Sequence, residues 1–357
     1  MVGTRPEIIK TAPIITELQR RSIPFSLVLT GQHYDYDMSL RFIHDLHLPK
    51  PDHTFRLGNR NPASQMGEIM TKLDIVLRRQ EGKLLCVQGD TNSMLAAALT
   101  GIKLRLRVCH VEAGLRSYDW RMPEEHNRRM VDHVSDILFA PTKTSERNLK
   151  EEHVHGKVYV TGNTVIDAVN QYMPVAERES RIADLIEFNE FVLATLHRAE
   201  NVDQEDLLRT FVDVFVNSPI PVVFPIHPRT SRKLREGKML TKLKRSRNVQ
   251  VIHPLGYLDF LMALRKSRII LTDSGGVQEE ATAPCLRKPV LVLRRSTERP
   301  EVLQKGFGKM VALNREDILQ ALDESLNKQY RFPRSSPFGD GRAAQRIVSI
   351  LSRVTQG

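Results

Sequence analysis

Short β-branched segments alternate with longer segments of helical periodicity along almost the whole chain. The sequence predicts strands at Phe25–Leu29, Leu84–Gln88, Arg107–Val111, Ile137–Ala140, Val158–Thr161, Phe191–Thr195, Val222–Ile226, Val249–His253, Ile269–Thr272, Val290–Leu293 and Met310–Leu313. Helical patterns between them include Pro62–Arg79, Asp203–Val216, Leu258–Arg265 and Asp317–Asn327. Such alternation is typical of parallel sheets with crossover helices, so we expect a doubly wound α/β fold.

The chain has 357 residues, more than one hydrophobic core usually supports, so we expect two domains. Pro174 and the charged stretch after it interrupt the strand–helix rhythm and indicate a boundary. A second linker, rich in Pro, Ser and Gly, lies near Tyr330–Gly341. The expected domains are residues 1–168 and 169–338. A last helix, within 339–357, is expected to pack back on the first domain.

Charge and cysteine content narrow the class of protein. The formal net charge of +11 favours an anionic partner, which could be nucleic acid, an acidic membrane surface or a phosphorylated small molecule. The densest basic stretch, 229–247, has no aromatic residue for base stacking, so we interpret it as a solvated helix face and expect no nucleic-acid partner. No apolar run is long enough to span a bilayer, and the three cysteines have no metal-ligand spacing. We expect a cytoplasmic protein without a membrane segment or a metal.

The segment Asp273-Ser274-Gly275-Gly276 follows the predicted strand Ile269–Thr272 and precedes a helix. Free backbone N–H groups at such a turn favour anions, and glycine lets the backbone approach a ligand closely. Ser274 adds a hydroxyl group, and Glu280, farther along the helix, could accept hydrogen bonds from a ribose. The alternative is an ordinary N-capped helix.

The segment GTRPEIIKTAP near the N-terminus has the same arrangement of a glycine turn leading into a helix. Arg5 and Lys10 could reach a phosphate together, or they could be ordinary surface cations. Only Met1-Val2 precedes this turn, so we expect a very short first strand or a sequence that lacks a few native residues.

Carboxylates follow two neighbouring predicted strands. Asp90 comes after Leu84–Gln88, Glu112 comes after Arg107–Val111, and Glu124 belongs to the stretch PEEHNR, which also contains Arg128. Carboxylates that crowd at one edge of a sheet raise one another's pKa, which suits proton transfer near neutral pH. The alternative for Asp90 is a helix N-cap.

Polar residues also follow the strands of the second domain. His197 and Arg198 come after Phe191–Thr195, His227 comes after Val222–Ile226, and Arg299 comes after Val290–Leu293. By itself His197 is more often a hydrogen-bonded core residue than a catalyst. Because the polar clusters of both domains lie at strand carboxyl ends, we expect them to line an interdomain active-site cleft.

Seven segments together resemble the non-hydrolysing UDP-N-acetylglucosamine 2-epimerase family. They are GTRPEIIKTAP, QGDT, VEAGLR, PEEHNR, LHRAEN, DSGGVQEEA and TERPE, in the family's order over residues 3–301. The resemblance implies two Rossmann-like domains in the glycosyltransferase-B arrangement, no cofactor and a homodimer. It also implies conversion of UDP-GlcNAc to UDP-ManNAc by anti elimination of UDP and its re-addition to 2-acetamidoglucal.

The resemblance also implies roles for individual residues. Proton transfer falls to Asp90, Glu112 and Glu124, with His197 either assisting it or contacting the phosphates. The diphosphate would be held by Arg5, Lys10, Ser274, Gly275 and Gly276. Glu280 would hold the ribose and Arg299 the phosphate or sugar end, while Arg128, Arg198 and His227 would also bind substrate.

The sequence departs from the family pattern at four places. Gln88 stands where many members have His, the segment after Gln32-His33 differs from the one that binds an activating UDP-GlcNAc, residues 282–288 are altered, and the N-terminus is short. The alternatives are a 2-epimerase of a UDP-2,3-diacetamido uronic acid, a hydrolysing 2-epimerase, a glycosyltransferase of the same fold, and a nucleic-acid-binding protein.

Overall fold

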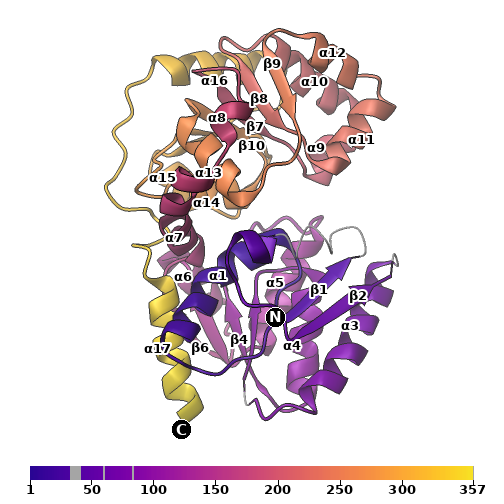
Figure 1. Ribbon diagram of the computed structural model, residues 1–357, viewed down its shortest axis with the longest axis vertical. Coiled ribbons are helices and arrows are strands. Elements are labelled where there is room, and N and C mark those ends of the chain that lie inside the picture. Colours follow the sequence, from indigo (N-terminus) through magenta and orange to yellow (C-terminus); the bar gives the residue numbers. More distant parts are fainter. Residues whose placement is uncertain (33–41, 59–60, 83, 357) are drawn as a thin grey trace. The chain divides into compact units, whose positions relative to one another are not determined.

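The computed structural model describes residues 1–32, 42–58, 61–82 and 84–356, so the segment that follows Gln32 lies outside the described residues. The chain divides into two compact units, both visible in Figure 1. Unit 1 comprises Met1–Ala168 and Phe338–Gly357, and unit 2 comprises Val169–Pro337. Each is an α/β unit with parallel strands flanked by helices.

Unit 1 contains a four-stranded parallel sheet in the order β3 (Leu84–Gln88), β4 (Arg107–Val111), β5 (Ile137–Ala140) and β6 (Lys157–Val160). A parallel pair, β1 (Val28–Gln32) and β2 (His53–Leu57), forms a second sheet. Between the two sheets lie the first two residues. The Val2 backbone exchanges hydrogen bonds of 2.8 and 2.9 Å with β1, and the N-terminal ammonium donates to the carbonyl of Cys86 in β3 over 2.9 Å. At the N-terminus the structure thus shows a single parallel β-bridge between Val2 and Leu29.

The helices of unit 1 are α1 (Arg5–Arg20), α3 (Pro62–Leu77), α4 (Asn92–Lys103), α5 (Pro123–Val134), α6 (Lys143–Glu151) and α17 (Ala343–Gln356). α17 lies against α1 (Figure 1) and buries apolar side chains against β4 and β5. Its first turn is capped by Asp167, whose carboxylate accepts from the Ala344 N–H over 2.8 Å. Burial raises the pKa of Asp167 to about 6 although these N–H groups oppose the rise.

Unit 2 contains one six-stranded parallel sheet in the order β12, β11, β10, β7, β8, β9. Its strands are β7 (Val192–Thr195), β8 (Val222–Pro225), β9 (Val249–Ile252), β10 (Ile269–Thr272), β11 (Val290–Val292) and β12 (Gly308–Met310). β7 and β10 lie side by side at the centre of the sheet. β8 and β9 follow β7 toward one edge, and β11 and β12 follow β10 toward the other edge. The strand order therefore reverses between β7 and β10, and such a switch point is where α/β sheets bind ligands, beyond the carboxyl ends of the strands.

Helix α7 (Thr164–Glu179) carries the chain from unit 1 into unit 2. The other helices of unit 2 are α8 (Ile182–Leu185), α9 (Ala199–Val202), α10 (Glu205–Val216), α11 (Pro228–Glu236), α12 (Leu240–Arg245), α13 (Tyr257–Lys266), α14 (Gly275–Glu280), α15 (Pro300–Gln304) and α16 (Arg315–Asn327). The core of unit 2 packs α10 and α16 against the central strands. In the described part of the chain, no helix is both long and apolar enough to cross a membrane.

The predicted α/β class is confirmed, and β3, β4, β5 and β10 have the predicted bounds. β6, β7, β8, β9 and β11 differ from the predicted bounds by one residue at one end or at both, and three strands differ by more. β1 begins three residues later than expected, and β12 lies two residues earlier than expected. β2 was missed because its sequence, HTFRL, is polar and only alternate residues near its end are buried.

Two glycines of unit 1 give opposite predictions for stability. A Cβ at Gly156 would lie 2.1 Å from the Ser135 carbonyl oxygen, whereas a Cβ at Gly67, inside α3, would meet nothing within 4 Å. We expect Gly156→Ala to lower the free energy of unfolding by about 1–3 kcal/mol through overpacking. Gly67→Ala should raise it by about 0.5–1 kcal/mol through helix propensity. Urea denaturation of the two variants checks these predictions. Equal changes in the free energy of unfolding would contradict the packing described.

Candidate active site

Glu112 is the first residue after β4, and its backbone has a φ of +71°, a left-handed conformation that costs a residue with a side chain about 1–2 kcal/mol. Its carboxylate is 8% exposed. Lys10 of α1, itself 5% exposed, forms an ion pair with it. The Gln88 amide donates to it over 2.5 Å and the Asn163 amide over 3.3 Å. A cation and two amides thus orient a strained, buried carboxylate at the carboxyl edge of the sheet.

Asp90 lies in the loop between β3 and α4, where its carboxylate is half-buried. Arg128, on α5, donates to it from Nη2 over 2.5 Å and from Nε over 3.1 Å. The same guanidinium donates to Glu125 over 2.9 Å. Helix α5 presents Glu125 and Arg128 on one face because they are three residues apart. The N-cap of α4 is Thr91, so Asp90 is not the helix cap that we considered as its alternative role.

Glu124 and Glu125 are neighbours in sequence but differ in environment. Glu125 is buried and accepts from the Ser117 backbone and hydroxyl, each over 2.9 Å. Burial raises the pKa of Glu125, but these donors and Arg128 outweigh it and lower the pKa overall. Glu124 is half-exposed, and within the described ranges it has no hydrogen bond or ion pair. Glu125 therefore has a structural role, and Glu124 is available to a ligand.

A buried charge network that the sequence analysis missed lies beneath this edge. The two ring nitrogens of His110 contact the Asp132 carboxylate at 2.7 Å and the Gly89 carbonyl at 3.0 Å. Arg116 pairs with Asp132 at 2.8 Å. Burial raises the pKa of Asp132, but His110 and Arg116 outweigh it and hold the pKa below the ordinary value of 3.8. Because a ring nitrogen of His110 contacts the Gly89 carbonyl oxygen, the network holds the loop that carries Asp90 in place.

The N-terminal turn is fixed by Glu7. Its carboxylate accepts from the backbone of Gly3 and Thr4 over 2.6 and 2.8 Å and from the Thr91 hydroxyl over 2.6 Å. Burial raises the pKa of Glu7. Arg5 is half-buried with its guanidinium 4.6 Å from the ring centroid of Phe42. The structure pairs the Lys10 ammonium with Glu112, and the expectation that Arg5 and Lys10 reach a phosphate together stays a prediction.

In unit 2, Asp273 organises the switch point between β7 and β10. Its fully buried carboxylate accepts from the backbone N–H groups of His197 and Arg198 at 3.0–3.2 Å and from the Asn201 amide at 3.1 Å. The His197 Nδ1 atom lies 3.0 Å from it. Burial raises the pKa of Asp273, but His197 and the N–H donors outweigh it, so the pKa is lowered. The carboxylate thereby holds the His197 loop beside the turn that follows β10.

That turn leads into α14, with Ser274 as its N-cap residue. A Cβ at Gly275 would lie 2.8 Å from the Arg299 Nη1 atom, so a larger residue there would displace the Arg299 side chain. At Gly276 the nearest atom to such a Cβ is the Ser274 hydroxyl at 4.0 Å, so the backbone faces open space. Glu280 ends α14 and is buried. His227 is exposed as the N-cap residue of α11, and its ring centroid lies 5.8 Å from that of His197.

A buried cluster of arginines and glutamates surrounds the turn. Arg299 donates to Glu279 over 2.9 Å and also pairs with Glu298. Arg294 donates to Glu298 over 2.5 Å, and Arg198 donates to it over 3.3 Å. Arg299 is therefore committed to carboxylates rather than directed only at a ligand. The Arg198 Nε atom is buried and has no hydrogen-bond partner among the described residues.

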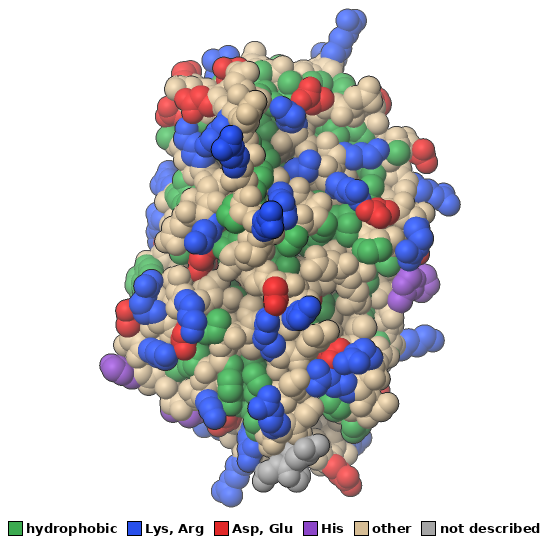
Figure 2. Space-filling view, turned by 90° about the vertical axis from the view of Figure 1, so that its left-hand side faces the viewer, with side chains coloured by type: hydrophobic (Ala, Val, Ile, Leu, Met, Phe, Trp, Pro, Cys, Tyr) green, Lys and Arg blue, Asp and Glu red, His purple; other side chains and the backbone are tan. Residues whose placement is uncertain are grey.

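Among the residues that the structure describes, no three His, Cys, Asp or Glu side chains are grouped so that they could hold a metal ion. Figure 2 shows one face of the protein, on which Lys and Arg side chains are scattered with fewer Asp and Glu among them, in keeping with the net charge of +11.

Comparison with known proteins gives consistent matches over the whole chain. The family model described as UDP-N-acetylglucosamine 2-epimerase matches residues 16–352. A UDP-N-acetylglucosamine 2-epimerase of Methanocaldococcus jannaschii is 41% identical over 99% of this chain and 98% of its own. Its crystal structure with UDP-GlcNAc and UDP matches with a TM-score of 0.92. A UDP-2,3-diacetamido-2,3-dideoxy-D-glucuronate 2-epimerase of Pseudomonas aeruginosa is 36% identical over 99% of both chains.

The Asp132 network predicts a pH-dependent loss of stability. Asp132→Asn should lower the free energy of unfolding by about 3–5 kcal/mol at pH 7, because it leaves Arg116 and His110 without their buried counter-ion. The lowered pKa means that this stabilisation is present above pH 3.8 and is lost as the pH falls through the folded-state pKa. Urea denaturation at several pH values should therefore show that the difference in free energy of unfolding between wild type and variant becomes smaller below pH 3.8.

The matched control for this comparison is Asp74→Asn, which removes an exposed ion pair with Arg78. It should change the free energy of unfolding by less than about 1 kcal/mol at each pH. The buried network would be contradicted if Asp132→Asn lowered the free energy of unfolding by no more than the control does.

Proposed function

Because the chain belongs to the UDP-N-acetylglucosamine 2-epimerase family, we propose that it interconverts UDP-N-acetylglucosamine and UDP-N-acetylmannosamine. The reaction proceeds by anti elimination of UDP and its re-addition through 2-acetamidoglucal. The observation that carries the proposal is the strained Glu112, buried beside Lys10 at the carboxyl edge of β4. Backbone strain of this kind persists where the surrounding structure enforces it, and it clusters at active sites.

Unit 1 supplies the proton transfer in this proposal. A carboxylate takes the proton from C2, the C2–H electrons form the C1–C2 double bond, and the C1–O bond breaks with its electrons going to UDP. On return, UDP attacks C1 while C2 is protonated on the opposite face. Inversion therefore needs acid–base groups that serve both faces, and Asp90, Glu112 and Glu124 are our candidates.

Unit 2 supplies the hold on the leaving group. The C2 proton is only weakly acidic, so stabilising the expelled diphosphate must drive the elimination. We assign this stabilisation to the backbone of Ser274, Gly275 and Gly276 and to the buried Nε donor of Arg198. His197 contacts the diphosphate as well, and unit 1 adds the positive charge of Arg5. Glu280 binds the ribose, and His227 binds the substrate beside His197.

Three cations also pair with carboxylates, which the motifs did not indicate. Lys10 orients Glu112, Arg128 orients Asp90, and Arg299 holds Glu279 and Glu298 beneath the turn. We propose that they are positioning residues. Their charge-assisted hydrogen bonds hold the neighbouring carboxylates in place.

A second candidate substrate is a UDP-2,3-diacetamido uronic acid, because the Pseudomonas aeruginosa relative acts on that class by name and matches over 99% of the chain. The two substrates differ at C6, where the uronic acid carries a carboxylate, and at C3, where it carries an acetamido group in place of a hydroxyl. Competition between them in one reaction mixture decides, and far faster turnover of UDP-GlcNAc would exclude the uronic acid. A homodimer and a cytoplasmic location remain predictions of the sequence.

Asp90→Asn tests the acid–base assignment. The substitution keeps the shape of the side chain and removes its basicity, so turnover should fall by about 10²–10⁴-fold while UDP affinity changes little. Steady-state kinetics measures the turnover, and calorimetric titration with UDP measures the affinity. Asp74→Asn is the control, because Asp74 lies on the exposed side of α3. Near-normal turnover of Asp90→Asn would mean that Asp90 has only a structural role.

A further inference from the structure

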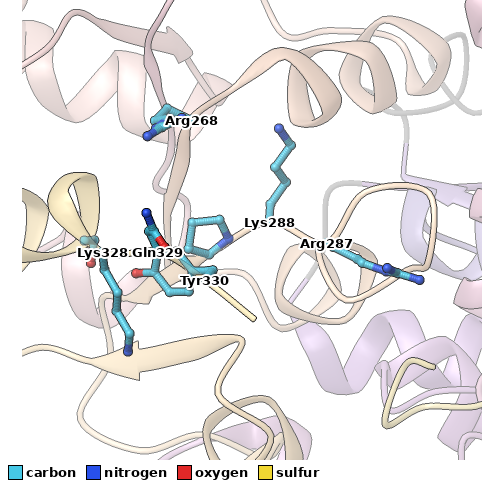
Figure 3. Close-up of a pocket in the computed structure, with 8 residues that line it drawn as sticks. Arg268, Arg287, Lys288, Lys328, Gln329 and Tyr330 are labelled. Atoms are coloured by element: carbon cyan, nitrogen blue, oxygen red, sulfur yellow. The ribbon is translucent and has the colours of Figure 1, made fainter. Parts of the chain in front are cut away.

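Unit 2 contains a hollow of about 480 Å³ that the proposed reaction does not use. Its lining includes Arg268, Arg287, Lys288, Lys328, Gln329 and Tyr330, and it contains no acidic residue. In the view of Figure 3, Lys328, Gln329 and Tyr330 lie on one side, Arg287 lies on the other, and Lys288 lies between them.

The hollow lies at the opposite edge of the sheet from the candidate active site. Arg268 directly precedes β10, and Lys288 is two residues before β11. Both strands therefore begin at the hollow, whereas the Asp273 turn follows the carboxyl end of β10. The four residues of β10 separate the two places by about 13 Å.

Lys288 is half-buried, and its ammonium donates to the Ser267 carbonyl over 2.7 Å. A lysine ammonium has three N–H donors, so others remain for a ligand. Burial lowers the pKa of Lys288, and the charges of Arg268 and Arg265 lower it further. Within the described residues no carboxylate pairs with Lys288.

The other cations of the hollow are only weakly compensated. Arg268 lies 3.5 Å from Glu190, but both side chains are more than half exposed, and such pairs contribute little. Arg287 donates to the Arg334 carbonyl over 2.9 Å, which orients its guanidinium without neutralising it. Four cationic side chains thus line the same hollow, and an anion that bound there would offset their positive charge.

Tyr330 is the one aromatic residue among those that line the hollow. The Tyr330 ring stacks on Phe332 at 5.0 Å, and Phe332 stacks on Phe307 at 4.7 Å. The Lys328 ammonium lies over the Tyr330 ring at 5.2 Å. These contacts occupy ring surface that a nucleobase would need for stacking, so they favour a compact ligand over a nucleotide.

We propose that this hollow is a binding site for a compact, multiply charged phosphate anion, separate from the site of the proposed reaction. Arginine and lysine together suit phosphate, since a guanidinium donates two parallel hydrogen bonds and an ammonium adds a mobile charge. Inorganic pyrophosphate is the simplest probe, and small phosphate esters belong to the same class.

A local fluorescence reporter tests the proposal. The chain has one tryptophan, Trp120, which is exposed in unit 1, so the double substitution Trp120→Phe and Tyr330→Trp places the only tryptophan in the hollow. Pyrophosphate should change its emission in a saturable manner. Adding Lys288→Gln should raise the dissociation constant by about tenfold or more, since one charge-assisted contact is lost.

Lys244→Gln in the same reporter is the matched control. Lys244 is an exposed cation of unit 2 in the densest basic stretch, so its loss changes the net charge equally but should leave the dissociation constant within about twofold. UDP affinity, measured on all variants, should not change, which separates this site from the proposed reaction. If Lys288→Gln fails to fold by circular dichroism, Arg287→Gln replaces it.

Three results would overturn the proposal. They are no emission change up to about 10 mM pyrophosphate, equal weakening by Lys244→Gln and Lys288→Gln, and tighter binding by an RNA oligonucleotide or by anionic lipid vesicles than by pyrophosphate. The last result would assign the hollow to a macromolecular surface.

Discussion

The ion pair between Lys10 and Glu112 is the interaction on which the site in unit 1 depends. Two charges that are almost completely buried lose their hydration, and they are tolerated only because each neutralises the other. Lys10 is on α1 and Glu112 follows β4, so the pair ties the N-terminal helix to the sheet. It also holds Glu112 in its left-handed conformation, which turns the carboxylate toward Gln88 and Asn163. The strain at Glu112 is thus balanced by contacts from three other segments.

Unit 2 uses a buried carboxylate in a different way. Asp273 also follows a central strand, but its oxygens are taken up by the chain itself, through the backbone of His197 and Arg198 and the amide of Asn201. It shapes a loop and does not remain available for proton transfer. This contrast supports dividing the chemistry between the units, with acid–base groups in unit 1 and the hold on the leaving group in unit 2.

The sequence predicted best those features that depend on neighbours along the chain. β5 and β10 are buried along their whole length and almost entirely apolar, and they were predicted to the residue, whereas the polar, half-buried β2 was missed. Candidate site residues followed from their positions after strands, but their partners did not. Lys10 and Glu112 are 102 residues apart, so only the fold shows that this cation pairs with this carboxylate. Similarly, helical periodicity alone could not show that Glu125 is buried while Glu124 is accessible.

The central claim is that the C2–H bond breaks and re-forms while UDP is expelled and added back. Incubation with UDP-GlcNAc in D₂O, followed by NMR, tests it most directly. The account predicts UDP-ManNAc that carries deuterium at C2, because the proton taken by the carboxylate exchanges with solvent before C2 is reprotonated. UDP-ManNAc without deuterium at C2 would contradict the elimination, and free ManNAc with an equal amount of UDP would indicate a hydrolysing enzyme instead.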